Sequence, residues 1–409
     1  MAAPSLPAGL AALGGRTPDA VAPPPRHPRF PLVDGMRAIA VLCVVVVHAA
    51  FFGDADSGSL PGRLLAHLNI GVTIFFLISG FLLFRPFIAH RGGGPPAPAV
   101  ADYAKRRFLR IFPAYWLVLT VLLVLPGLPS VNYQHVWPMY ALLHTLPITS
   151  GPQCSALVTR CGLAQTWSLV AELSFYLVLP VYAGATERLT RGLSLRAWAA
   201  TQAALLAALA TISVVLEYVL LNPAPLWFGW TVCGTALWFA LGMGLAVTSV
   251  VVQGRGTERA MSLRMSRAAG GLWVLAIAGY VLLCLALPPS MFFLTSAQRL
   301  VSHVAFAGIA LLLLGPITLA GDPGGIVARI TRGRLMQWLG LISYGIFLWH
   351  YPVVLTLGPA HGTSGFLALG AGTLAISVVC AAASYYALER PVMRLKYRPL
   401  YRPRPGSVV

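Results

Sequence analysis

Charged residues are scarce in this sequence. Only 10% of its 409 residues are Asp, Glu, Lys or Arg, whereas about 25% is typical of soluble domains. Hydrophobic residues make up 57% of the chain, which excludes a soluble fold because no soluble core hides that much apolar surface. Intrinsic disorder is excluded as well, since it requires low hydrophobicity. A polytopic membrane protein remains.

Cysteine is also sparse, with six residues and no Cys/His spacing typical of zinc sites. We therefore expect no metal. Cys154 and Cys161 share a predicted outer loop, 126–166, in a compartment that permits disulfides. Whether they pair stays open, because sequence gives no Cα geometry. The other four lie in apolar runs and are expected to pack as small hydrophobes: Cys43, Cys233, Cys284 and Cys380.

Long apolar segments dominate the rest of the chain. About 20 apolar residues cross a hydrocarbon core about 30 Å thick. Ten segments approach this length, which predicts an all-α, polytopic membrane helix bundle with about ten transmembrane helices. They are 36–52, 68–84, 108–125, 167–184, 198–221, 227–252, 271–287, 300–320, 335–357 and 364–388.

The basic residues follow this topology. If the N-terminus is cytoplasmic, all but three of the 29 Lys and Arg fall on cytoplasmic segments, the exceptions being Arg63, Arg160 and Arg299. Cytoplasmic loops carry such an excess, so both termini are predicted to be cytoplasmic. The pattern accounts for the net charge of +18 without nucleic acid.

Three regions follow from these patterns. Residues 1–30 are rich in Pro and Ala and lack the basic segment followed by an apolar segment that marks a signal peptide. They are predicted to form a disordered cytoplasmic leader. Residues 31–393 form the predicted transmembrane domain. Residues 394–409 form a basic cytoplasmic tail that is too rich in Pro to fold. The expected location is the inner (plasma) membrane, with lipid as the surrounding partner.

Ionisable residues at membrane depth are functional candidates, since each is costly to insert. Arg37 and His48 lie eleven residues apart in the first segment. On a helix this spacing is about 1100°, so both lie on one face, about 16 Å apart along the axis. Such a face could line a path across the membrane. Alternatively, His48 bonds a neighbouring carbonyl, and Arg37 snorkels or pairs with Asp34.

Two carboxylates lie near the predicted outer side. Glu172 follows Ser168 by one turn, and could orient or charge-stabilise His48 if their helices meet. Alternatively, Glu172 is a protonated acid that is hydrogen-bonded to a nearby hydroxyl group. For Glu217 we favour a place at the membrane interface.

A basic cluster precedes the third segment. Arg107 and Arg110 share one face of a predicted helix, and Arg106 and Arg110 are also neighbours at i, i+4. Guanidinium groups suit phosphate, although the positive-inside rule alone also places arginines here.

Small and polar residues mark two further segments. Gly71, Ser79 and Gly80 are expected to serve close helix packing. Ser343, Tyr344 and His350 form a polar seam in which His350 could be an interfacial anchor. His135, His144 and His303 are expected to be structural or loop residues.

These pieces occur together in one order. The sequence resembles the membrane acyltransferase-three family, O-acyltransferases of cell-surface polysaccharides, lipopolysaccharide O-antigen, peptidoglycan and some antibiotic sugars. The matching stretches are PLVDGMRAIAVLCVVVVH, GVTIFFLISGFLL, YAKRRFLRIFPAYW, TWSLVAELSFYLVLP, LGLISYGIFLWHYPV and YYALERPVM. The positions that match the family's functional motifs are Arg37, His48, Arg106, Arg107, Arg110 and Glu172.

The resemblance implies an acyl-CoA donor, usually acetyl-CoA, used from the cytoplasmic side, and a sugar-type hydroxyl acceptor met toward the outer side. The inner arginines would hold the CoA phosphates. His48 would act as general base or carry the acyl group, with Glu172 fixing its tautomer. The alternative from a different class is a transporter or flippase of a lipid-linked or sugar substrate. A non-catalytic scaffold is a third possibility.

Overall fold

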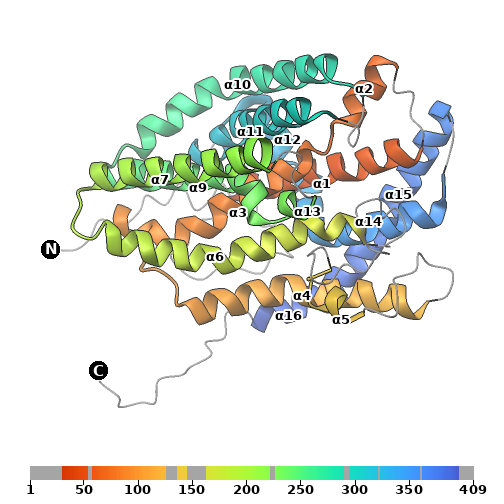
Figure 1. Cartoon of the computed structure of the whole chain (residues 1–409), viewed down its shortest axis with the longest axis horizontal. Helices are drawn as coiled ribbons and strands as arrows, with labels where there is room; N and C mark the ends of the chain where they lie inside the picture. Colours follow the sequence, from red (N-terminus) through yellow and green to blue (C-terminus); the bar gives the residue numbers. More distant parts are fainter. Residues whose placement is uncertain are drawn as a thin grey trace, which may run out of the picture.

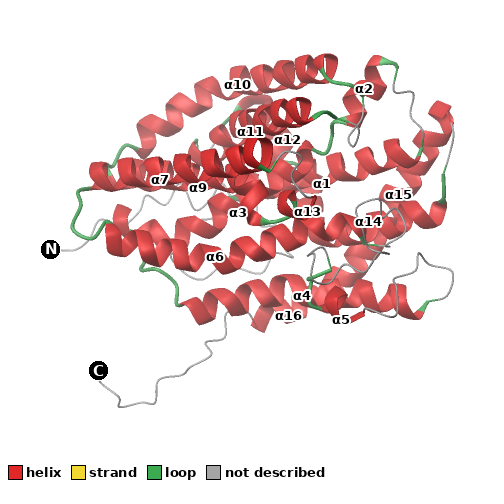
Figure 2. Cartoon of the chain, viewed as in Figure 1, coloured by secondary structure: helices red, strands yellow, loops and turns green. Residues whose placement is uncertain are grey.

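The computed structural model describes residues 30–53, 58–125, 136–144, 163–221, 226–289, 294–320, 323–359 and 362–395. Most of these residues are helical, the rest form loops and turns, and none is in a strand (Figure 2). The all-α prediction is therefore confirmed for this part of the chain. Four sequence predictions lie outside it: the leader up to residue 29, His135, the Cys154–Cys161 pair, and the tail from residue 396.

The predicted number of membrane-crossing segments is confirmed. Nine helical segments in the described part of the chain are long and apolar enough to cross a membrane, and one bent pair raises the number to ten. The long helices are α1 (Pro31–Phe52), α3 (Ile70–Ile88), α4 (Val100–Val124), α6 (Trp167–Leu189), α7 (Leu195–Val215), α9 (Val232–Gly254), α10 (Glu258–Ala286), α11 (Ser296–Leu319) and α15 (Gly362–Ser384).

Shorter elements extend or connect these helices. They are α2 (Leu60–Ala66), α5 (Val136–Tyr140), α8 (Leu226–Gly229), α12 (Gly325–Arg332), α16 (Arg390–Arg394) and the π-helical turns Leu216–Leu220 and Tyr385–Glu389.

The ninth predicted segment is not straight. The sequence predicts one span over 335–357, but α13 (Arg334–Leu341) and α14 (Ser343–Leu357) meet at an angle of 72°. Two glycines let the two halves pack on different neighbours. A Cβ on Gly340 would collide with the backbone of Asp34 in α1, and a Cβ on Gly345 would press on Ala381 in α15.

Helix α1 runs through the middle of the bundle (Figure 1) and packs against α3, α11, α12, α13, α14 and α15. Glycines also bring α3 close to its neighbours. A Cβ on Gly80 would collide with the backbone of Phe239 in α9, and one on Gly242 of α9 would collide with Leu77 of α3. Gly71 lies in the same way against the α1 backbone. The packing role expected for Gly71 and Gly80 is therefore confirmed, in agreement with the small-residue interfaces of membrane helices.

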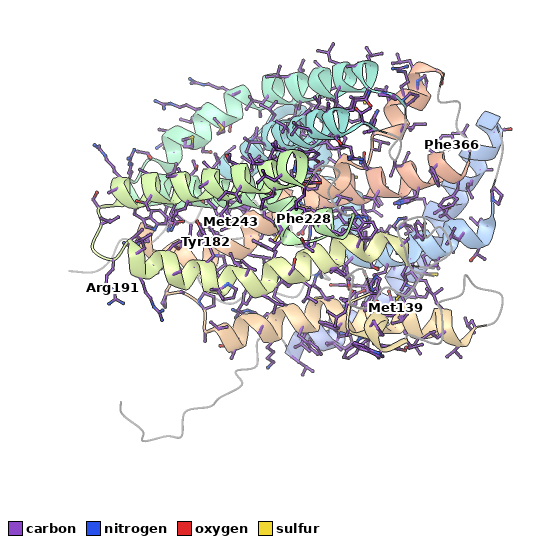
Figure 3. All side chains as sticks on the ribbon, in the orientation of Figure 1. Met139, Tyr182, Arg191, Phe228, Met243 and Phe366 are labelled. Carbon is purple, nitrogen blue, oxygen red and sulfur yellow. The ribbon has the colours of Figure 1, made fainter. Side chains whose placement is uncertain are left out.

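The two ends of the bundle differ in composition. Arg191, between α6 and α7, and Phe366, near the start of α15, lie at opposite ends (Figure 3). Cross-helix ion pairs and hydrogen bonds occur near the same connection as Arg191: the Arg91 guanidinium lies 3.0 Å from the Glu187 carboxylate. Basic residues thus help to join the helices at this end, the one predicted to be cytoplasmic.

Candidate active site

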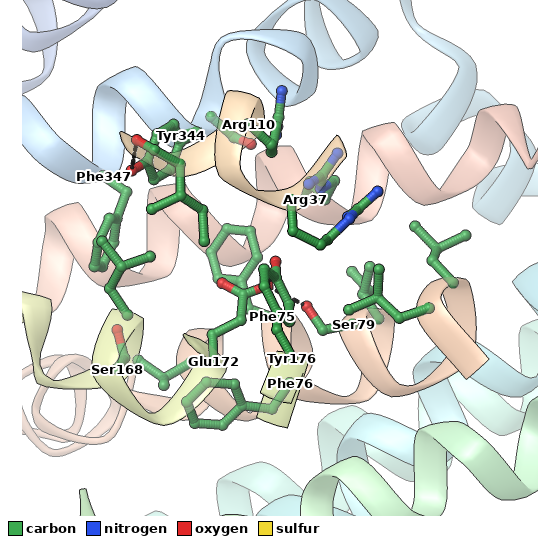
Figure 4. A pocket seen from close by; sticks show the side chains of 18 residues that line it. Arg37, Phe75, Phe76, Ser79, Arg110, Ser168, Glu172, Tyr176, Tyr344 and Phe347 are labelled. Atoms are coloured by element: carbon green, nitrogen blue, oxygen red, sulfur yellow. Dashed lines mark hydrogen bonds between the residues drawn. The ribbon is translucent and has the colours of Figure 1, made fainter. Parts of the chain in front are cut away.

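A cavity lies between α1, α3, α4, α6 and α14 (Figure 4). It contains about 820 Å³ of space, open solvent included. Its apolar walls come mainly from α3. Nine of its lining residues are polar or charged: Arg37, Ser79, Arg107, Arg110, Ser168, Glu172, Tyr176, Ser343 and Tyr344.

Three arginines give the cavity a positive charge. Arg37 comes from α1, and Arg107 and Arg110 come from α4. The Arg107 guanidinium carbon lies 5.7 Å from the ring centroid of Tyr176, and that of Arg110 lies 5.8 Å from the centroid of Tyr344. The buried Nε atoms of Arg37 and Arg107 have no hydrogen-bond partner among the described residues. Unsatisfied guanidinium donors in a cavity suit an anionic ligand such as a phosphate.

Of the predicted arginines, Arg37 lines the cavity and Arg106 does not. The proposed pairing of Arg37 with Asp34 is present, with 3.7 Å between Nη1 and Oδ1, and it coexists with a place at the cavity. Arg106 was expected to bind the donor together with its neighbours, but it is not among the residues that line the cavity. At about 100° per residue, Arg106 lies about 140° around the helix from Ile111 and beyond Arg110, so it falls outside the arc that Arg107, Arg110 and Ile111 present to the cavity.

Glu172 is held by two hydroxyl groups. Ser79 Oγ of α3 and the Tyr176 hydroxyl both donate to Glu172 Oε1, each at 2.7 Å (Figure 4). The Ser79 bond joins α3 to α6 at the cavity wall, whereas the Tyr176 bond lies within α6. They also place one carboxylate opposite three guanidinium groups, so the polar lining has a net positive charge. The structure does not bring Glu172 to His48, the arrangement suggested from sequence.

The partner of His48 is another histidine. His350 Nε2 of α14 lies 3.3 Å from His48 Nδ1 of α1, and the two ring centroids are 5.1 Å apart. His350 is fully buried, whereas His48 is partly exposed. The interfacial role suggested for His350 is therefore wrong: the ring lies inside the bundle, also 6.3 Å from the ring of Tyr351.

Backbone carbonyls assign the tautomers of this pair. A carbonyl oxygen only accepts, so His48 Nδ1–H donates to Val44 O at 2.8 Å, and His350 Nδ1–H donates to Phe347 O at 2.7 Å. In a neutral ring, His350 Nε2 is then unprotonated, and it shares the single His48 Nδ1–H with Val44 O as the longer arm, 3.3 Å, of a bifurcated hydrogen bond. It follows that His48 Nε2 carries the free lone pair, the state needed for a base or a nucleophile.

The histidine pair adjoins the cavity but does not line it. Phe347 belongs to the cavity lining, and its ring centroid lies 5.9 Å from that of His350. Arg37 lines the cavity, whereas His48 does not. The sequence suggested that both residues line one path across the membrane, but only Arg37 lines this cavity.

Sequence reasoning missed several polar contacts of this region. Tyr176 was detectable in principle, because it follows Glu172 by four residues and shares its helix face. Ser79 and His350 were not, since each meets its partner from a distant segment. Within the described residues, no group of three His, Cys, Asp or Glu could hold a metal ion.

Two other histidines have local partners. His144 Nε2 lies 3.0 Å from Thr166 Oγ1, and burial lowers the pKa of His144 to about 4, so the ring is neutral. His303 stacks on Trp238 with ring centroids 4.3 Å apart. Both fit the structural role expected for them.

Fold and site together define a polytopic membrane protein with an arginine-lined cavity beside a histidine pair. The family model described as "Acyltransferase domain" matches residues 30–385, and the chain belongs to this acyltransferase family. No solved structure gives a significant match.

Relatives named as acyltransferases match most of the chain. Acyltransferase MdmB of Streptomyces mycarofaciens is 25% identical over 91% of this chain and 94% of its own length. Peptidoglycan O-acetyltransferase OatA of Listeria monocytogenes is 25% identical over 80% of this chain, and O-acetyltransferase OatA of Staphylococcus aureus is 23% identical over 80%. The matches cover 50% and 51% of the two OatA proteins, so this chain spans about half of their length.

Proposed function

We propose that the chain is an integral membrane O-acyltransferase that moves an acyl group, in the first place acetyl, from acyl-CoA to a hydroxyl of a sugar-containing acceptor. The observation that carries this proposal is the cavity itself: three guanidinium groups line it, and the buried Nε atoms of two of them have no partner among the described residues. The histidine pair, with an unprotonated His48 Nε2, adjoins this cavity at Phe347. Family membership supports the reaction class.

The donor binds by its phosphates. Arg37, Arg107 and Arg110 offer charge-assisted hydrogen bonds at the end of the bundle that the basic loops assign to the cytoplasm. The pantetheine arm then extends toward α14. Because His48 lies outside the cavity lining, the arm passes Phe347 to bring the thioester near Nε2.

His48 Nε2 could serve the reaction in two ways, and in the first it acts as a general base. Nε2 takes the proton of the acceptor hydroxyl, and the oxygen attacks the thioester carbonyl carbon. The C–O bond forms, the C–S bond breaks, and the sulfur leaves as a thiolate that takes the proton from the imidazolium. In the second version Nε2 attacks the thioester carbonyl carbon first, so that the N–C bond forms, the C–S bond breaks and the thiolate leaves. The acceptor oxygen then attacks the acyl-imidazolium, the C–O bond forms as the N–C bond breaks, and the hydroxyl proton passes to the thiolate.

His350 positions the base. Its Nε2 shares the His48 Nδ1–H with Val44 O, at 3.3 Å and 2.8 Å respectively, and the two acceptors together hold the proton on Nδ1 and off Nε2 before reaction. When His48 becomes an imidazolium, the same bond becomes charge-assisted and stronger. His350 thus takes the orienting role that the sequence suggested for Glu172, while Glu172 and its two hydroxyl partners shape the donor cavity.

The acceptor is proposed from the relatives. Two of them are named O-acetyltransferases, one of peptidoglycan, which supports a cell-wall glycan hydroxyl as acceptor. His48 is partly exposed and lies about 16 Å along α1 from Arg37, so the acceptor is proposed to approach from the end of the bundle opposite the arginines.

A direct test uses the full chain in nanodiscs with acetyl-CoA labelled in the acetyl group and a soluble muramyl disaccharide. We expect labelled disaccharide and stoichiometric free CoA thiol, detected by mass spectrometry and a thiol reagent. If the acetyl label stays on CoA at every disaccharide concentration, the proposal is contradicted. Tight disaccharide binding that does not depend on CoA would support a transporter instead.

A further inference from the structure

A second, larger cavity lies between α7, α9, α10 and α11, and shares no lining residue with the first. It contains about 1490 Å³, open solvent included. Most of its lining is apolar, contributed by residues such as Ala199, Ala203, Leu241, Leu245 and Leu311. We call it the lateral groove.

The groove arises from the packing of four membrane helices. Helix α10 packs along α11 and barely touches α9, while Ala199 and Ala203 of α7 leave space on the other side. Gly244 marks this space on α9, since a Cβ added there would meet nothing within 4 Å. Gly242, two residues earlier, faces the opposite way and is closed against α3.

The groove is charged only at one end. Arg255, directly after α9 ends, and Arg264, in the first turns of α10, both line it and are exposed. This end is where two spans enter and leave the membrane, at headgroup level. An apolar groove at membrane depth with two cations at its headgroup end matches a molecule with long hydrocarbon chains and an anionic head.

We propose that the lateral groove binds one anionic phospholipid, with its acyl chains against α7, α9 and α10 and its phosphate at Arg255 and Arg264. Charge complementarity selects this occupant over a zwitterionic lipid. The bound lipid fills the face of α9 opposite Gly242, and so stabilises the contact of α9 with α3, the helix that carries Ser79.

Two double variants test the headgroup contact. Arg255→Gln with Arg264→Gln removes the charges that line the groove. Arg259→Gln with Arg267→Gln removes two exposed charges from the same helix, neither of which lines it. Both variants change the net charge equally, and both sites are exposed, so folding is preserved. The readout is native mass spectrometry of the full chain after titration with phosphatidylglycerol or phosphatidylcholine.

We expect the wild type and the Arg259/Arg267 variant to retain one phosphatidylglycerol, and the Arg255/Arg264 variant to bind it about 30-fold more weakly, the effect of losing two arginines at an anionic surface. Gly244→Leu places a side chain in the open space and should displace the lipid while the thermal unfolding temperature is kept.

Four results would overturn the proposal. The first is equal loss in both double variants, which would show a general charge effect. The second is equal retention of phosphatidylcholine, and the third is displacement of the lipid by glycerol phosphate alone. The fourth is an unaffected lipid in a folded Gly244→Leu protein. Donor affinity is measured in parallel, so failure here is distinguishable from failure of the acyltransferase proposal.

Discussion

Replacing Arg107 by Gln removes one guanidinium from the donor cavity. Its Nε is buried without a partner among the described residues, and its guanidinium lies over Tyr176. No protein acceptor at Nε therefore competes with the ligand. A hydrogen bond to a charged group contributes about 1.5–3 kcal/mol, so loss of one phosphate contact should raise the Kd for CoA by about 10- to 150-fold.

The matched control is Arg106→Gln, which removes the same charge from the adjacent position outside the cavity lining. Equilibrium dialysis of labelled CoA against nanodisc-embedded protein measures both variants. The control should stay within about twofold of the wild type, as expected for a partly screened charge outside the site. Equal weakening in both variants, or an unchanged Kd in Arg107→Gln, would refute the assignment of the cavity to donor phosphates.

Three further predictions concern residues that line the cavity or lie beside it. His350→Leu should lower kcat by about 10- to 150-fold, the value of a charge-assisted hydrogen bond to His48, while the Kd for CoA stays unchanged. The amide oxygen of His350→Gln accepts the same hydrogen bond, so this variant should restore part of the rate. Equal rates in both variants would contradict a positioning role. Ser79→Ala with Tyr176→Phe removes both donors to the cavity carboxylate and should weaken CoA binding at least as much as either single change, by the same dialysis assay. Phe347→Trp enlarges the side chain between cavity and histidines, and should reduce transfer in single-turnover experiments without affecting CoA binding; faster transfer would mean that the thioester takes another route.

Much of the fold follows from hydropathy alone. Each predicted segment corresponds to a membrane-crossing helix or to the bent pair, because about 20 apolar residues in a row have few other stable states. The break near Ile342 was not predictable in this way. It depends on close packing of Gly340 and Gly345 against helices distant in sequence, and hydropathy averaged over a window contains no such information.

The candidate site was predictable in part for a similar reason. Periodicity within one helix placed Arg107 and Arg110 on one face, and both line the cavity. Partnerships across helices were not accessible. Glu172 pairs with Ser79 rather than with His48, and His48 pairs with His350, because the packing of α1, α3, α6 and α14 decides these contacts.

The most direct test of the account is the effect of His48→Ala on acyl transfer and on donor binding in the same preparation. General-base assistance contributes about 10²- to 10⁴-fold, so transfer from acetyl-CoA should fall by at least about 100-fold while the Kd for CoA stays at the wild-type value. Normal turnover by a folded His48→Ala protein would contradict the central role of this histidine.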